Sequence, residues 1–225
     1  MTRLQSELER LYLAAPASLF DAQGRVRALV LEAVLPAGWD RLSAVWQGVQ
    51  AELELPAPAI AVSGTDGVQL WFSLEAPVAV AQGHAFLDGL RTRWLADLAP
   101  ARVRLLPDPA APTRHAAPAP ARLAEDQWSA FVAPDLAAVF ADTPWLDIEP
   151  GEDGQAALLH GLQAIEPAAF ADALARLRAP AREVPAPTPA APGRSDDPRT
   201  FLLRVMHDET VALALRIEAA KALLR

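Results

Sequence analysis

The chain has 225 residues, a formal net charge of −8 and no cysteine. Its length suits one medium domain with an appendage or two small domains, and hydrophobic residues make up 52%, enough for a packed core. The lack of cysteine excludes disulfides, thiol catalysis and Cys-ligated metal sites. The acidic balance argues against tight nucleic-acid binding over a large surface, so we expect any such contact to use a small patch.

The N-terminal segment and the distribution of apolar residues predict a cytoplasmic protein of bacterial type. The segment MTRLQSELERLYLAAP is charged and amphipathic, unlike a secretory signal. The sequence contains no apolar run of about 18 residues, the length that a membrane-spanning helix needs. We therefore expect no membrane association.

After a short amphipathic helix over residues 2–14, the sequence alternates between strand and helix periodicity. The expected strands cover 25–35, 60–62, 68–74 and 101–106, and the expected helices cover 40–53 and 79–98. This order is typical of a ferredoxin-like, or RRM-like, βαββαβ sheet of the α+β class. In that topology the first and third strands are central and the fourth lies beside the first.

A hairpin is predicted where Ser63-Gly64-Thr65-Asp66-Gly67 separates two apolar segments. Asp-Gly between strands is a strong hairpin signal, because glycine accepts the positive φ that a tight turn requires. The following strand alternates strictly, so its two faces differ in character. One face carries Val68, Leu70, Phe72 and Leu74, and the other carries Gln69, Trp71 and Ser73.

The same alternation, applied to neighbouring strands, places polar side chains together on the face away from the helices. That set is Glu32, Gln69, Trp71, Arg102 and Arg104. It predicts either a cross-strand ion pair covered by the rest of the chain or a ligand site. Trp71 either stacks a base on an open sheet or packs against Trp128, Trp145 or Phe140.

The second half of the chain divides by composition. We expect a Pro/Ala linker over 108–122, an acidic and mostly helical region over 123–178 packed on the sheet, a disordered linker over 179–196, and a tethered helical tail over 197–225. The helices expected in the acidic region cover 124–132, 136–140, 154–165 and 168–178. We expect one sheet-based domain over residues 1–107.

The stretch Ser63–Phe72 resembles the Ser-Gly-x-x-Gly-x-His-hydrophobic-Trp-Phe signature of the archaeo-eukaryotic primase superfamily. Ala101–Pro107 is similar to the Arg-Val-x-Arg-x-Pro-Gly-Thr stretch of that family, and Val30–Val34 stands where the family places its Asp-x-Asp strand. The resemblance covers about residues 25 to 110. It implies an RRM-like core that handles nucleotides or nucleic acid.

Departures from the family pattern fall on the residues that carry its chemistry. Glu32 is the only carboxylate on its strand, whereas a two-metal site needs clustered carboxylates. Gln69 replaces the family histidine and cannot exchange a proton near neutral pH. Leu105 stands at the second arginine, with Arg104 one place away.

We therefore predict a non-catalytic, primase-like module that binds nucleic acid, a nucleotide or a replication-type partner, with no catalytic residue, metal or cofactor. Its expected binding residues are Glu32, Ser63, Gln69, Trp71, Arg102 and Arg104. The alternative is an interaction or regulatory protein without a nucleic-acid role. In that case the tail, which is similar to a segment of some phage terminase small-subunit-like proteins, docks a protein partner through Phe201, Leu202, Val205 and Met206.

Overall fold

The computed structural model describes residues 1–111, 114–178 and 221. Of its two compact units, Met1–Ala181 and Arg182–Arg225, the first holds every described residue except Lys221. The predictions for the 179–196 linker and for the tail anchors Phe201, Leu202, Val205 and Met206 lie outside the described residues. None of the described helices has the length and hydropathy needed to cross a lipid bilayer.

The described unit combines helices with one sheet and is therefore of the α+β class. The strands are β1 (Val26–Val34), β2 (Ala59–Val62), β3 (Gly67–Val78), β4 (Val103–Leu106), β5 (Ala121–Ala124) and β6 (Gln127–Val132). The α-helices are α1 (Arg3–Leu11), α2 (Gly38–Ala51), α3 (Val80–Trp94), α4 (Glu152–His160) and α5 (Pro167–Arg178). Two short 3-10 helices, η1 (Pro100–Arg102) and η2 (Ala137–Phe140), complete the set.

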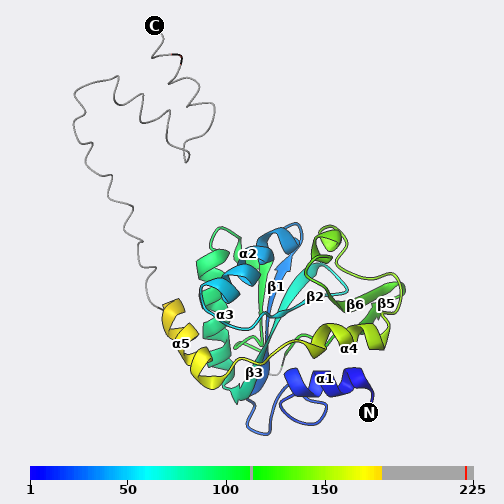
Figure 1. Ribbon diagram of the computed structural model, residues 1–225, viewed down its shortest axis with the longest axis horizontal. Helices are drawn as coiled ribbons and strands as arrows, with labels where there is room; N and C mark the ends of the chain where they lie inside the picture. The colour runs from blue at the N-terminus through cyan, green and yellow to red at the C-terminus, as the bar shows by residue number, and fades with distance from the viewer. Residues whose placement is uncertain (112–113, 179–220, 222–225) are drawn as a thin grey trace, which may run out of the picture. The chain divides into compact units, whose positions relative to one another are not determined.

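All strand pairs are antiparallel, and the order across the sheet is β4-β1-β3-β2-β6-β5 (Figure 1). In the register of β1, Glu32 lies opposite Gln69 of β3 on one side and Arg104 of β4 on the other. The sheet has six strands, and its order differs from the expected four-stranded sheet because β6 and β5 extend it beyond β2. The short strand β4 forms one edge.

The first face of the sheet, which carries Leu70 and Phe72, packs beneath α2, α3 and α5. Leu29 and Leu31 from β1 join the same core, as strand alternation requires. Phe170 of α5 lies against Phe86 of α3, with ring centroids 5.2 Å apart. The sequence-based prediction of which face packs on the helices is therefore confirmed.

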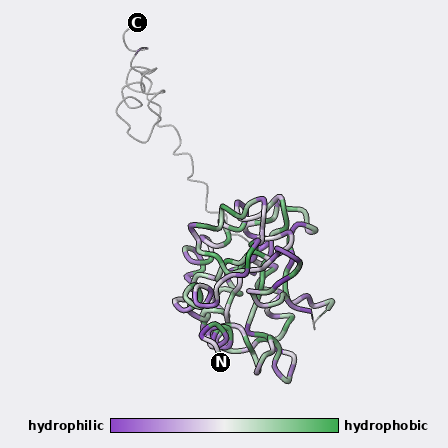
Figure 2. The backbone as a smooth tube through the Cα atoms, turned by 90° about the vertical axis from the view of Figure 1, so that its right-hand side faces the viewer, coloured by the Kyte–Doolittle hydropathy of each residue, from purple (hydrophilic) through white to green (hydrophobic). Residues whose placement is uncertain are grey.

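The second face, which carries Gln69 and Trp71, is covered by α1 and α4, on the opposite side of the sheet from α3 and α5 (Figure 1). Trp71 is 0% exposed and lies among the rings of Tyr12, Phe131 and His115. These are not the predicted neighbours of Trp71, which were Trp128, Trp145 or Phe140, so that prediction was wrong. Figure 2 shows hydrophobic and hydrophilic residues interleaved along the whole unit, consistent with a sheet that buries both faces.

The predicted helix over 124–132 is wrong, because this segment forms strands β5 and β6 and enlarges the sheet. Glu125 and Asp126 form the turn between them, and Asp126 has a left-handed φ of 55°. A six-residue strand is too short to display a clear period against an alanine-rich background. Of the other expected helices, α4 and α5 are present and 137–140 is a 3-10 helix. Of the two α-helices in this region, α4 joins α1 on the second face, whereas α5 packs on the first.

Residues 108–122, predicted to be a linker, are part of the fold where they are described. The ring of His115 bonds the carbonyl of Ala28 through Nε2 at 2.9 Å, and Ala116 and Ala119 are buried against the second face. Burial lowers the pKa of His115. Because a carbonyl oxygen can only accept, the Nε2–H group of His115 is the donor in this bond. The proline-rich composition concealed this packing because small residues show little periodicity.

Glu7 ties α1 to the end of α4 and gives the fold a pH-dependent contact. Its carboxylate accepts hydrogen bonds from Nε of Arg10 at 2.7 Å and Nδ1 of His160 at 2.8 Å. Burial raises the pKa of Glu7, but these donors outweigh it and hold the pKa below its ordinary value. Because the pKa is depressed on folding, the contact stabilises the protein above the unfolded-state pKa of about 4.3 and is lost as the pH falls through the folded value.

We expect Glu7→Gln to lower the free energy of unfolding at pH 7 by about 1 kcal/mol, since one charge-assisted contact is weakened. The variant should also lose less stability than wild type as the pH falls below the unfolded-state pKa of about 4.3, because it has no carboxyl group at position 7 to take up a proton. Urea unfolding at pH 7 and at lower pH measures both effects, with the exposed Glu149→Gln as control. Equal acid sensitivity of Glu7→Gln and wild type would show that the contact does not contribute.

Candidate functional site

The turn between β2 and β3 is built by Ser63 and Gly64. The Ser63 hydroxyl oxygen accepts hydrogen bonds from the backbone N–H groups of Thr65 at 3.2 Å and Gly67 at 3.0 Å. Gly64 has a φ of +82°, a conformation that favours glycine. The positive φ was predicted at Gly67, but that glycine is needed for space, because a Cβ there would lie 2.7 Å from Oε1 of Glu32.

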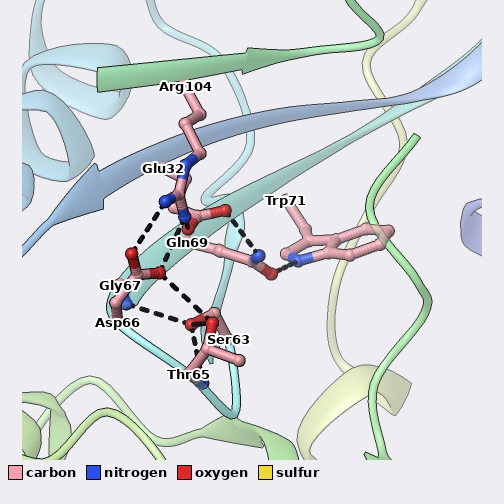
Figure 3. Close-up of polar contacts among 8 residues, drawn as sticks. All are labelled: Glu32, Ser63, Thr65, Asp66, Gly67, Gln69, Trp71 and Arg104. Carbon is pink, nitrogen blue, oxygen red and sulfur yellow. Dashed lines mark hydrogen bonds and ion pairs between the residues drawn. The ribbon is translucent and has the colours of Figure 1, made fainter. Parts of the chain in front are cut away.

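Glu32, Gln69 and Trp71 form a buried chain of hydrogen bonds across β1 and β3 (Figure 3). The indole Nε1–H of Trp71 donates to Oε1 of Gln69 at 2.8 Å, and Nε2 of Gln69 donates to Oε2 of Glu32 at 2.9 Å. Because an indole N–H can only donate, it fixes which end of the Gln69 amide faces Glu32. The polar groups of the second face are thus held in one orientation.

Arg104 links this chain to the β2–β3 turn (Figure 3). Its NH1 group donates to Oε1 of Glu32 at 2.5 Å and to Oδ1 of Asp66 at 2.7 Å, while NH2 donates to Oδ2 of Asp66 at 2.7 Å. These bonds from Arg104 hold the pKa of Asp66 below its usual range, and the bonds to Asp66 raise the pKa of Arg104. One guanidinium therefore bridges two carboxylates, and the three side chains together keep one negative charge.

The structure brings together most of the predicted site residues. Glu32, Gln69 and Arg104 are in one network and Ser63 lies at its edge, so their predicted proximity is confirmed. Arg102 is separate: it lies in η1 before β4 begins, and its NH1 group donates to the carbonyl of Leu35. Its inclusion in the cluster was wrong, because strand alternation does not extend into a 3-10 turn.

Trp71 belongs to the network but is not an open stacking platform, since its ring is wholly buried. The interpretation that it stacks a base on an open sheet is therefore wrong. Asp66 was predicted only as a turn residue, although it is the main partner of Arg104. The Asp-Gly signal explained Asp66 without reference to any long-range contact.

A pocket of about 770 Å³ lies beside this network and around edge strand β4, which we call the β4 pocket. Its lining includes Glu32 and Gln69 from the second face and Arg91 of α3, a helix on the first face. Arg104 and Arg114 also line it, and Trp71 and Arg102 do not. A volume of this size suits a small organic ligand.

The charges that line the β4 pocket are three arginines and two carboxylates, in a chain whose net charge is −8. Arg91 is paired with Asp88 of its own helix, with NH2 2.8 Å from Oδ1. Arg114 is exposed and has no acidic partner in the described part of the chain. The carboxylate of Asp108 accepts from the backbone N–H of Ala110 at 2.9 Å. Positive charge that is not neutralised therefore lies at Arg114.

Within residues 1–111 and 114–178, no three His, Asp or Glu side chains are grouped so that they could hold a metal ion. Glu32, the only carboxylate of β1, is instead bonded to Arg104 and Gln69. No protein-family model matches the chain, and no curated protein is significantly similar to it.

Proposed function

We propose that the chain is a non-catalytic, primase-like module that binds a nucleotide or a phosphate-bearing nucleic-acid end in the β4 pocket. The observation that carries this proposal is a pocket of about 770 Å³ in an acidic chain, lined by arginines of which one, Arg114, has no acidic partner among the described residues. Arginine is the side chain best suited to phosphate, because its planar donors match two oxygens at once. Ser63, Gln69 and Glu32, from the stretches that resemble the primase superfamily, line the same pocket.

The proposal includes a ferredoxin-like core made of β1 to β4. The order β4-β1-β3-β2 within the larger sheet supports it, as does the position of α2 and α3 on one face. Strands β6 and β5 and helices α1, α4 and α5 are then additions to that core. The additions on the second face leave the pocket at the β4 edge as the place where a ligand reaches the signature residues.

We infer that the chain is not a catalyst from the hydrogen bonds of Glu32 and from the apolar residues beside it in β1. The carboxylate of Glu32 is already paired with a cation, since Arg104 bonds one oxygen and Gln69 the other, and its neighbours in β1 with the same orientation, Val30 and Val34, offer no second carboxylate. A two-metal mechanism needs carboxylates free to bind cations. We expect no primer synthesis from a single-stranded template with nucleoside triphosphates and magnesium or manganese, while equilibrium dialysis detects bound nucleotide. Product formation that disappears in Glu32→Ala would contradict the proposal.

The alternative, an interaction or regulatory protein, is favoured by the covered second face, which leaves Trp71 unable to stack a base. Docking of a partner through residues 197–225 stays a prediction, since those anchors lie outside the described residues. A chain that binds no phosphate-bearing compound, yet retains a co-purified partner only when residues 197–225 are present, would support this alternative.

A further inference from the structure

We infer that the β4 pocket has two chemically distinct ends, and that its ligand is a nucleoside phosphate with its phosphate at Arg114 and Arg91 and its base at Glu32 and Gln69. This inference rests on the proposed function and names the ligand class and its orientation. It assigns no phosphate contact to Arg104, although Arg104 is one of the expected binding residues. The charges and free hydrogen-bonding groups of the lining residues carry it.

Arg104 is unsuited to hold the phosphate. Its NH1 and NH2 groups are engaged by Glu32 and Asp66, and the two carboxylates together outweigh its single positive charge. A phosphate placed there would meet two anions and one cation, which is unfavourable at short range. Arg104 is thus a positioning residue that holds Glu32 and the β2–β3 turn in place.

Arg114 and Arg91 provide the better phosphate site. Arg114 has no acidic partner among the described residues, so a phosphate there would gain a charge-assisted contact without breaking an existing one. Arg91 shares its guanidinium with Asp88, whose side chain is 48% exposed, and a pair this open to solvent is weak. Asp108 also lines the β4 pocket, but two arginines against this one carboxylate leave positive charge for a phosphate.

Where Glu32 and Gln69 line the β4 pocket, they present an acceptor next to a donor. A carboxylate has about four acceptor positions and an amide nitrogen has two hydrogens. Glu32 uses one position on each oxygen, and Gln69 uses one N–H, so acceptor capacity on Glu32 and one N–H on Gln69 remain. Glu32 is 3% exposed and Gln69 7%, and both line the β4 pocket, so the edge of a ligand can reach this small polar surface, which we call the Glu32–Gln69 floor.

The Watson–Crick edge of every nucleobase carries a hydrogen-bond donor beside an acceptor, and proteins read unpaired bases through this edge. It therefore matches the Glu32–Gln69 floor. Guanine suits it best, because its neighbouring ring N–H and amino group both donate and a carboxylate accepts both. A ligand that joins such a base to a phosphate satisfies both ends of the pocket at once.

The test is calorimetric titration of the full chain at low salt with guanosine 5′-monophosphate, ribose 5-phosphate and guanosine. We expect the nucleotide to bind at least tenfold more tightly than ribose 5-phosphate, since only the nucleotide reaches the floor. Arg114→Ala should weaken the nucleotide and ribose 5-phosphate by a similar factor of about ten or more. Glu32→Gln should weaken the nucleotide and leave ribose 5-phosphate unchanged.

The outcomes separate the inference from the proposed function. Equal binding of nucleotide and ribose 5-phosphate by wild type would overturn the base site but keep a phosphate-binding pocket. No binding of any phosphate-bearing compound would overturn the proposed function itself. If Glu32→Gln does not fold, the wild-type comparison of the three ligands decides the base site, and Arg114→Ala, at an exposed position, decides the phosphate site.

Discussion

Arg104→Met is expected to lower the free energy of unfolding by about 2 kcal/mol at pH 7. The substitution leaves Glu32, which is buried, without its cation, and breaking a buried pair from one side costs about 3 to 5 kcal/mol. We place the loss below that range because the Arg104 side chain is 45% exposed and Gln69 still donates to Glu32. Urea unfolding followed by circular dichroism measures the change.

Two further variants show whether the buried charge is the cause. Arg41→Met removes an exposed ion pair with Asp97 and should change stability by no more than about 0.5 kcal/mol. Glu32→Gln in the Arg104→Met background should recover part of the loss, because the uncompensated charge is then absent. A loss in Arg104→Met that the second substitution makes worse would show that Glu32 contributes through something other than its pairing.

Trp71→Ala is expected to have the largest effect on stability, a loss of about 3 to 5 kcal/mol, since Trp71 is wholly buried. Its removal leaves a cavity between Tyr12 and Phe131 and takes the hydrogen-bond donor from Gln69. The same change at Trp145, which is only partly buried, should reduce stability much less. Equilibrium unfolding in urea gives both values.

This prediction separates a packed second face from an open one. If Trp71→Ala unfolded at the same urea concentration as wild type, Trp71 would be acting as a surface platform and α1 and α4 would not cover it. Trp71→Phe adds a finer comparison, because it keeps most of the ring contacts and removes only the N–H donor to Gln69. Its expected loss of about 1 to 3 kcal/mol is that of a buried acceptor left without a donor.

Local pattern was enough to predict the strands and helices of the first half and the two faces of β3. Alternation acts within one strand, so Leu70 and Gln69 had to face opposite ways. The meeting of Glu32, Gln69 and Arg104 followed from the same rule applied to neighbouring strands. Strand alternation did not predict the position of Arg102, because Pro100 begins a 3-10 turn and β4 starts only at Val103.

The local sequence pattern could not predict contacts between residues that are far apart in the chain. Nothing local in α1 indicates that Tyr12, just after it, contacts Trp71, or that Arg10 bonds the carbonyls at the end of α4. The hairpin of β5 and β6 was hidden by alanine and by the acidic turn at Glu125 and Asp126. Arg114, which lines the β4 pocket, was not among the predicted site residues because its segment has the composition of a linker.

Thermal unfolding with and without guanosine 5′-monophosphate is the most direct test of the division between a structural and a ligand-binding arginine. We expect Arg104→Met to melt at a lower temperature than wild type and still to be stabilised by the nucleotide. Without nucleotide, Arg114→Ala should have the melting temperature of wild type. Added nucleotide should not raise that temperature, because a ligand stabilises only a folded protein that it binds. Nucleotide stabilisation that persists in Arg114→Ala and vanishes in Arg104→Met would contradict this account of the β4 pocket.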